Sequence, residues 1–542
     1  MRHDTGKESQ DVVLKNGLIV DGSGGKPSPG NLLIRAGRIH RISAHAIRTT
    51  GVAIDCTGRV VAPGFIDAHS HLDWHLPLKG HDDSKYPFLA QGITTVIGGN
   101  CGWAPAGLRE GTRWRDQVED NPLAGSQLPI AWDTMEELFD KLQGSGTSQN
   151  LALMAGHGSS RVSIRGQDPS PLHPYESKEL FRLLEIAMEQ GARGISVGLQ
   201  LAPGLFARPE ELKEIALLVK NRGKILAVHP RTVAAVAPGH AQGFREASNI
   251  LALREVLDLA RQTGVRLQIS HLAFFGPRTW RTAETALQLI DQALADGLDV
   301  RFDACAVDAA VGRVSGMLSP WFQARGPAAF EDADAVKTLR KEVRRAERLL
   351  GVPASDVRVT DIMNPDLLEY NDKPLSEVSR LRRQSPSDAV IDMARRSAGK
   401  ARLLWRKMVN DKLLAELIRH RACLFMTGAA VERPGADNPA AFGGMARALQ
   451  VCREQGLLPV EEIVRRMTGA TAERFGIHDR GLLKEGLAAD IVVFDWETLN
   501  DNSMSPNGSR TPDGIDYVFV NGRKIIGAGK KESPLNAGLP LR

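Results

Sequence analysis

Residues 58–73 read GRVVAPGFIDAHSHLD, an apolar run that ends in two histidines separated by one residue. Side chains at i and i+2 lie on the same side of an extended strand, so His69 and His71 can direct both imidazoles at one point. Asp73 and His75 continue the alternation. The spacing suits metal chelation, although an isolated His-x-His is at least as often a pair of loop histidines. The surrounding fold must therefore decide between the two interpretations.

Apolar runs of strand length recur along the chain and alternate with helical patterns, which are clearest over residues 176–191, 209–222 and 250–264. This alternation favours a parallel sheet covered by helices. The runs are VVAPGFIDA, ITTVIGG, LALMAG, GISVG, KILAV, VRLQIS, LDVRF and ACLFM. Eight such strands predict an α/β fold of the (β/α)8 TIM-barrel type, in which the chemistry lies at the carboxyl ends of the strands.

Three regions are predicted along the chain. Residues 1–62 and 478–542 contain short β-type runs and turns, including the hairpin signal Asn521-Gly522, and predict one small β-sandwich domain built from both ends. Residues 63–477 form the barrel. Within it, residues from about 310 to 420 are mostly polar and helical in pattern, which predicts a helical lid inserted late in the barrel on the loop face.

Three further candidate ligands follow other predicted strands. Cys101 lies in the glycine-rich turn after the second run, while His229 ends the fifth and His271 ends the sixth. Alone, each such residue is more often structural than a ligand. Together with His69 and His71, however, they occupy strand ends that converge in a barrel. Mixed imidazole and thiolate donors favour zinc over magnesium or calcium.

A metal bound in this way activates water and polarises a carbonyl, which hydrolysis of an amide requires. His157 follows the third run in Gly156-His157-Gly158 and is a candidate catalytic residue that could orient a ligand or donate to an oxyanion. A structural histidine bonded to a loop carbonyl explains this position equally well.

Composition narrows the class of protein further. A hydrophobic fraction of 42%, a charged fraction of 25% and a net charge of +5 over 542 residues are ordinary for a globular enzyme and indicate no nucleic-acid or membrane partner. The five scattered cysteines fit reduced thiols, and the polar N-terminus MRHDTGKESQ has no apolar signal core. We therefore expect a cytoplasmic protein that acts on a small molecule. Its oligomeric state, a homo-oligomer included, stays open.

The motifs together resemble the D-aminoacylase (N-acyl-D-amino-acid deacylase) branch of the amidohydrolase superfamily, over almost the whole chain. They are VVLKNGLIVDGSG, GRVVAPGFIDAHSHLD, QGITTVIGGNCG, AGHGSSRVSIRG, GARGISVGLQLAPG, ISHL followed by FFG, and DRGLLKEGLAADIVVFD. The resemblance implies one tighter zinc site at Cys101, His229 and His271, and contributions of His69 and His71 to a second, weaker site. It also implies a barrel, a two-ended β-sandwich domain and a late lid.

The chain departs from this family at the predicted catalytic base. Where the family carries a Ser-Asp-Gly signature whose aspartate binds metal and accepts a proton, residues 426–429 read Met-Thr-Gly-Ala, so no carboxylate occupies this position. Glu432 and Asp437 follow shortly and are the candidate substitutes. Without a positioned base, proton transfer typically loses ~10²–10⁴-fold, although a metal hydroxide can still attack.

Groups that hold the substrate carboxylate in the family are also replaced. The residues at those positions are Leu201, Ala273, Cys305-Ala306-Val307 and Asn438-Pro439-Ala440. Loss of these cationic and phenolic donors predicts a more apolar pocket and a different N-acyl or cyclic amide substrate.

The leading hypothesis is a zinc-dependent hydrolase of a non-peptide C–N bond. Two alternatives stay open: a metal-assisted lyase, isomerase or condensing enzyme that does not need the missing base, and a catalytically silent member that binds a small molecule or partner.

Overall fold

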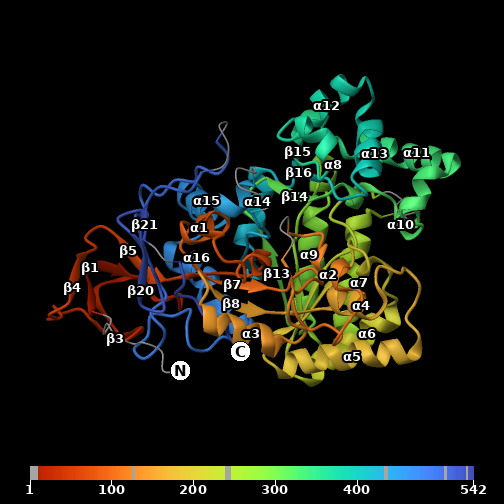
Figure 1. Cartoon of the computed structure of the whole chain (residues 1–542). Helices are drawn as coiled ribbons and strands as arrows, with labels where there is room; N and C mark the ends of the chain where they lie inside the picture. Colours follow the sequence, from red (N-terminus) through yellow and green to blue (C-terminus); the bar gives the residue numbers. More distant parts are fainter. Residues whose placement is uncertain (1–9, 125–127, 238–245, 432–437, 506–509, 533–534) are drawn as a thin grey trace.

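The chain forms a parallel-stranded body with a sheet from both chain ends on one side and a separate insertion on the other (Figure 1). The structure is a computed structural model that describes residues 10–124, 128–237, 246–431, 438–505, 510–532 and 535–542. Its secondary structure is mixed α/β. Among these residues, no helix combines the length and the apolar character needed to cross a membrane.

All eight predicted runs contain strands of the body: β6 (Phe65–Asp67), β7 (Ile93–Gly98), β8 (Asn150–Leu153), β10 (Gly194–Gly198), β11 (Ile225–His229), β12 (Arg266–Ile269), β13 (Val300–Ala304) and β17 (Cys423–Phe425). The first three pair in parallel, and β9 (Ala155–Gly156) begins a second parallel sheet that runs through β10, β11, β12 and β13 to β17. Only Met154 separates β8 from β9. The backbone N–H of Ala68 donates to the Phe425 carbonyl at 3.2 Å, which places the first strand beside the last.

Helices follow most of these strands and cover them. They are α1 (Asp82–Leu89), α2 (Arg115–Glu119), α3 (Met135–Ser145), α4 (His157–Arg165), α5 (Pro174–Glu189), α6 (Pro209–Asn221), α7 (Ser248–Thr263), α8 (Pro277–Trp280), α9 (Ala283–Ala295), α14 (Asp411–Arg419), α15 (Pro439–Gln455), α16 (Val460–Met467) and α17 (Gly469–Arg474). The three helices predicted from periodicity correspond to α5, α6 and α7. In α7, Leu253, Val256, Leu257 and Ala260 are buried at helical spacing, and Gly264 ends the helix in the left-handed conformation.

One predicted strand is two strands in the structure. The run VVAPGFIDA is divided into β5 (Val60–Pro63), which pairs with β18 (Ile491–Phe494), and β6, which pairs with β7. Gly64 lies between the two strands, and a side chain there would clash, since a Cβ would lie 2.2 Å from the hydroxyl oxygen of Thr94. The prediction of a single strand was therefore wrong, since continuous apolar character does not reveal that the chain changes sheets.

Strands from both chain ends form one nine-stranded sheet. Its members are β1 (Val12–Ile19), β2 (Ser28–Arg35), β3 (Arg38–Ser43), β4 (Val52–Asp55), β5, β18, β19 (Ile515–Val520), β20 (Arg523–Gly527) and β21 (Lys530–Lys531). The antiparallel pairing of β5 with β18 joins the two ends. Asn521 and Gly522 connect β19 to β20 with positive φ angles of 48° and 76°, as the hairpin signal predicts.

The insertion contains a sheet as well as helices. Its elements are β14 (Ala309–Arg313), α10 (Pro320–Ala324), α11 (Ala333–Leu350), β15 (Val357–Asp361), α12 (Leu375–Arg382), α13 (Pro386–Arg396) and β16 (Arg402–Arg406). β16 lies between β14 and β15 in an antiparallel sheet that the helical prediction missed. The pairing of β14 with β16 joins segments about ninety residues apart, so local periodicity carries no sign of it. Arg313 of β14 anchors the insertion to the body through Asp120 at 2.6 Å.

Candidate metal centre

Four predicted ligands lie together at the carboxyl ends of three strands. One ligand atom from each of His69, His71, Cys101 and His271 falls within 4.8 Å of all the others. His69 and His71 follow β6, Cys101 follows β7 and His271 follows β12. The parallel direction of these strands explains the convergence, because their carboxyl ends face the same side of the body.

The thiol of Cys101 is the centre of the cluster. Its Sγ lies 3.3 Å from His69 Nε2, 3.1 Å from His271 Nε2 and 3.3 Å from His229 Nδ1. His229, at the end of β11, therefore joins the other four. The structure brings all five predicted ligands together around one sulfur atom.

The backbone is strained at two of these ligands. Cys101 and His271 both have a φ of 54°, in the left-handed region that non-glycine residues rarely adopt. The turn around Cys101 is held by Ser196, whose hydroxyl donates to the Gly99 carbonyl and accepts from the Gly102 N–H. Gly102 cannot be replaced without a shift, since a Cβ there would lie 2.8 Å from the backbone nitrogen of Gly198. Such strain concentrates at functional sites.

Burial controls the charge of the donors. It lowers the pKa of His69, His71 and His271 well below the usual value and that of His229 to about 4, so neutral imidazoles with free lone pairs prevail at neutral pH. Burial also raises the pKa of the Cys101 thiol. Nδ1 of His71 is buried and has no hydrogen-bond partner among the described residues. Neutral imidazoles around one sulfur are a donor set that fits zinc.

Two neighbouring side chains that the sequence analysis did not single out hold these histidines. Asp303, at the end of β13, accepts from the His271 backbone N–H at 2.9 Å and lies 3.5 Å from Nδ1 of His69. Gln200 Oε1 lies 3.0 Å from Nε2 of His229, the ring nitrogen opposite the one that faces Cys101. Asp303 directly follows the predicted strand LDVRF, and its place at a strand end could have identified it. Nothing in the sequence pointed to Gln200.

His157 is not part of the metal cluster. It begins α4, is fully buried, and its Nε2 lies 2.6 Å from Glu211 Oε1 of α6. Nε of Arg161 lies 3.8 Å from the same carboxylate oxygen. His157 is also absent from the residues that line the cavity described below. The observed partner is a carboxylate and not the loop carbonyl of the structural interpretation, and the catalytic role of His157 stays a prediction.

The position of the missing aspartate lies directly against the metal cluster. The Gly428 N–H donates to the His69 carbonyl at 2.8 Å, and the neighbouring Thr427 hydroxyl donates to Asp67 at 2.5 Å. A Cβ at Gly428 would lie 3.1 Å from Cε1 of the His271 ring. The predicted substitutes Glu432 and Asp437 lie outside the described residues.

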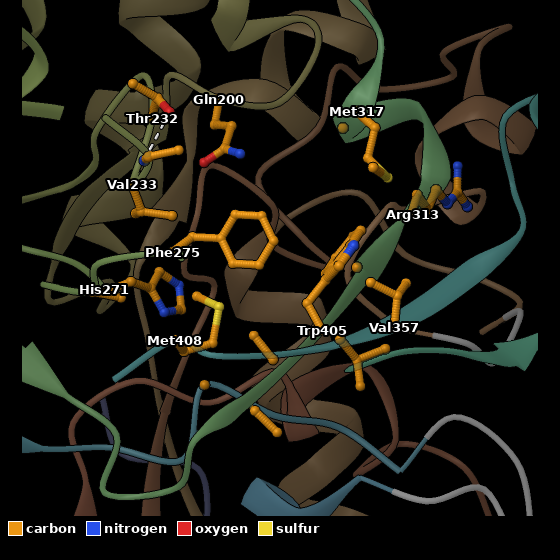
Figure 2. A pocket seen from close by; sticks show the side chains of 18 of the residues that line it. Gln200, Thr232, Val233, His271, Phe275, Arg313, Met317, Val357, Trp405 and Met408 are labelled. Atoms are coloured by element: carbon orange, nitrogen blue, oxygen red, sulfur yellow. Dashed lines mark hydrogen bonds between the residues drawn. The ribbon is translucent and has the colours of Figure 1, made fainter. Parts of the chain in front are cut away.

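A cavity of about 330 Å³ extends from the cluster to the insertion. Figure 2 shows His271 on one side of it, Arg313 and Met317 on the opposite side, and Trp405 of β16 between them. The replaced family positions also line this cavity: Leu201, Ala273, Cys305, Val307, Asn438 and Ala440. The substitutions read from the sequence therefore surround the space next to the metal centre.

A model of the amidohydrolase family matches residues 52–216 and 324–526. N-acyl-D-glutamate deacylase of Alcaligenes xylosoxydans xylosoxydans is 29% identical over 525 residues, which cover 96% of this chain and 94% of the relative. D-aminoacylase of the same organism is 28% identical over 536 residues, which cover 95% of this chain and 94% of the relative.

Solved structures agree with these matches. N-acyl-D-glutamate deacylase from Bordetella bronchiseptica, complexed with zinc and a phosphonate inhibitor, has a TM-score of 0.78 at 25% identity and covers 99% of this chain and 100% of that chain. A crystal structure of D-aminoacylase has a TM-score of 0.77 at 24% identity, with coverage of 98% and 99%, and this likeness shows the fold.

Proposed function

Because this chain belongs to the amidohydrolase family, as its motifs predicted, we propose that it is a zinc-dependent hydrolase of a non-peptide amide bond in a small molecule. The observation that carries the proposal is the buried cluster of His69, His71, Cys101 and His271, with His229 against the same thiol. The zinc in the Bordetella relative supports the choice of metal. The (β/α)8 barrel and the role of residues 310–420 as its lid are part of the proposal.

The proposed zinc ligands are Cys101, His229 and His271, with His69 and His71 available to a second, weaker ion. Zinc held there supplies Lewis-acid activation of water and of the amide carbonyl. The chain's own residues position these donors: Gln200 fixes the ring of His229, and Asp303 holds the backbone of His271. Gly428 has no side chain to accept a proton, so Glu432 and Asp437 remain the carboxylates to test for that role.

The names of the relatives support an N-acyl compound as the substrate class, since the proteins at 29% and 26% identity are deacylases of N-acyl-D-glutamate and N-acyl-D-aspartate. The replaced positions around the cavity favour a different member of that class.

The test is metal content per chain in protein purified without a metal-affinity tag, compared with the Cys101→Ala variant. We expect about one zinc per chain in the unmodified protein and little in the variant. Cys452→Ala is the matched control, because Cys452 is another buried cysteine but lies in α15, outside the cluster. Failure of the unmodified protein to bind zinc would contradict the proposal.

Hydrolysis is tested separately by turnover of N-acyl amides in ¹⁸O-labelled water. Incorporation of label into the released acid supports hydrolysis. Conversion of substrate without label would instead support a metal-assisted reaction in which water is not the nucleophile. Such a reaction would not need the carboxylate that is absent at Gly428.

A further inference from the structure

The cavity beside the proposed metal centre continues into the insertion, where most of the residues that line it are apolar. On the body, Leu201, Val233 and Phe275 line it. On the insertion, it is lined by Val343, Ala346 and Leu350, which are buried residues of α11 at helical spacing. A bound molecule that reaches from His271 to α11 would therefore contact apolar side chains for most of its length.

Among the described residues that line the cavity, the two arginines are each paired with a carboxylate. Arg231 binds both carboxylate oxygens of Glu255, at 2.8 and 2.9 Å, and also donates to the carbonyls of Leu205 and Ala207. Arg313 donates to Asp120 Oδ1 at 2.6 Å and to the carbonyls of Asp120 and Asn121. Asp120 also pairs with Lys400 at 3.0 Å, and Arg313 lies across the cavity from His271 (Figure 2). Among the described residues that line the cavity there is no lysine, and Arg231, on the body, is paired with Glu255.

Polar side chains near the centre are also engaged. The amide oxygen of Gln200 faces His229, and the Thr232 hydroxyl accepts from the backbone N–H of Ala234 at 3.1 Å. Asn438 donates to the Ala430 carbonyl at 2.8 Å. A carboxylate transferred from water into this space would lose its hydration without gaining a cationic partner from the side chains named here. Such a transfer is strongly unfavourable.

We propose that the cavity selects uncharged substrates that carry an extended apolar group and no free carboxylate next to the reacting amide, such as N-acyl amines or N-acyl amino-acid amides with long acyl chains. The inference rests on the proposed function for the identity of the reacting bond. The selection itself follows from the cavity walls. Each added methylene buried against them is expected to strengthen binding about fourfold until the cavity is filled.

The test uses the zinc-loaded protein and non-hydrolysable ketones in which a methylene replaces the amide nitrogen. Two matched series differ only in a terminal carboxylate or its neutral methylamide, with acyl chains of increasing length, and dissociation constants are measured by calorimetry. We expect the neutral series to bind at least about tenfold more tightly, and affinity to rise with chain length. Tighter binding of the carboxylate series, equal binding, or no dependence on length would overturn the inference.

This measurement separates the inference from the proposed function. If the neutral long-chain ketones bind as expected while no amide is cleaved, the selection stands and hydrolysis fails. If amides are cleaved but carboxylate-bearing short-chain compounds bind best, hydrolysis stands and the selection fails.

A gain-of-charge variant provides a second test. Ala273 lies two residues after His271, is half-buried and lines the cavity. We expect Ala273→Lys to reverse the preference toward the carboxylate series, because it adds a cation without an existing partner. Ala295→Lys, at the exposed end of α9, adds the same charge away from the cavity and should leave the preference unchanged. An unchanged preference in folded Ala273→Lys would count against the proposed electrostatic selection.

Discussion

Replacing Gly428 by aspartate should add a carboxylate at the position where the proposed metal centre has no side chain. A Cβ at this position points at the His271 ring, 3.1 Å from Cε1 and 3.3 Å from Nδ1, so a carboxylate attached to it enters the cluster. The φ of Gly428 is 60°, in the left-handed region where aspartate and asparagine are the best tolerated side-chain-bearing residues. The substitution is therefore compatible with the backbone that exists.

Two effects of opposite sign set the expected magnitude. The left-handed conformation and the close contact with His271 should cost about 1–2 kcal/mol of unfolding free energy, and Gly428→Asn should incur the same cost. A positioned general base typically contributes ~10²–10⁴-fold to the rate, of which the lower limit corresponds to about 2.7 kcal/mol of activation free energy. We therefore expect Gly428→Asp to be less stable than the unmodified protein but at least about 100-fold faster in amide hydrolysis than Gly428→Asn.

The assay compares kcat of the two variants on the same N-acyl amide after equal zinc loading, with unfolding by denaturant as the check on stability. Because the side chains have the same shape, the difference between them isolates the carboxylate. Equal rates in two folded, zinc-loaded variants would refute the reasoning that a carboxylate at this position completes the site.

Two further predictions concern side chains around the metal centre. Gln200→Leu should weaken zinc binding about 10–100-fold, because the ring of His229 loses its partner. Zinc affinity is measured by competition with a chelator, and Gln323→Leu, elsewhere in the cavity, should leave it unchanged. Equal zinc affinities of the two variants would exclude a positioning role of Gln200. Burial lowers the pKa of His75 to about 3, so below pH 6.5 the unfolded chain binds a proton that the folded chain does not. Protonation therefore favours unfolding, and the free energy of unfolding falls as the pH drops from 6.5 toward 3. Between pH 6.5 and 4.5 the zinc-free protein should lose ~2.3 kcal/mol more unfolding free energy than His75→Asn, and parallel curves would contradict this. The comparison with the variant is needed because Asp67 and Asp73, with pKa values raised to about 7, act in the opposite direction.

The strands and their terminal ligands were predictable from sequence because both follow from short-range patterns. An apolar run followed by His69 and His71, or by His229, places the histidines at a strand end whatever packs beside it. The missed features depend on contacts between distant segments. β5 pairs with β18 from the other end of the chain while β6 pairs with β7, and β14 pairs with β16 across the insertion.

The same limit applies to individual side chains of the site. Glu211 lies fifty-four residues from His157 in sequence, and no local pattern links the two. Gln200 reaches His229 only because β10 and β11 are neighbours in the sheet. Ligands could therefore be predicted one strand at a time, while their supporting partners required the assembled structure.

The strain at the ligands bears on whether the centre is functional. Cys101 and His271 each hold a left-handed backbone that costs of order 1–3 kcal/mol, and such conformations persist only where the surroundings enforce them. Here Ser196 fixes the turn on both sides of Cys101, and Asp303 accepts the His271 N–H. These contacts direct one sulfur and one imidazole nitrogen to within 3.1 Å of each other. Metal binding at the proposed centre would offset this cost, so the strain at these two residues supports the proposal of a metal site.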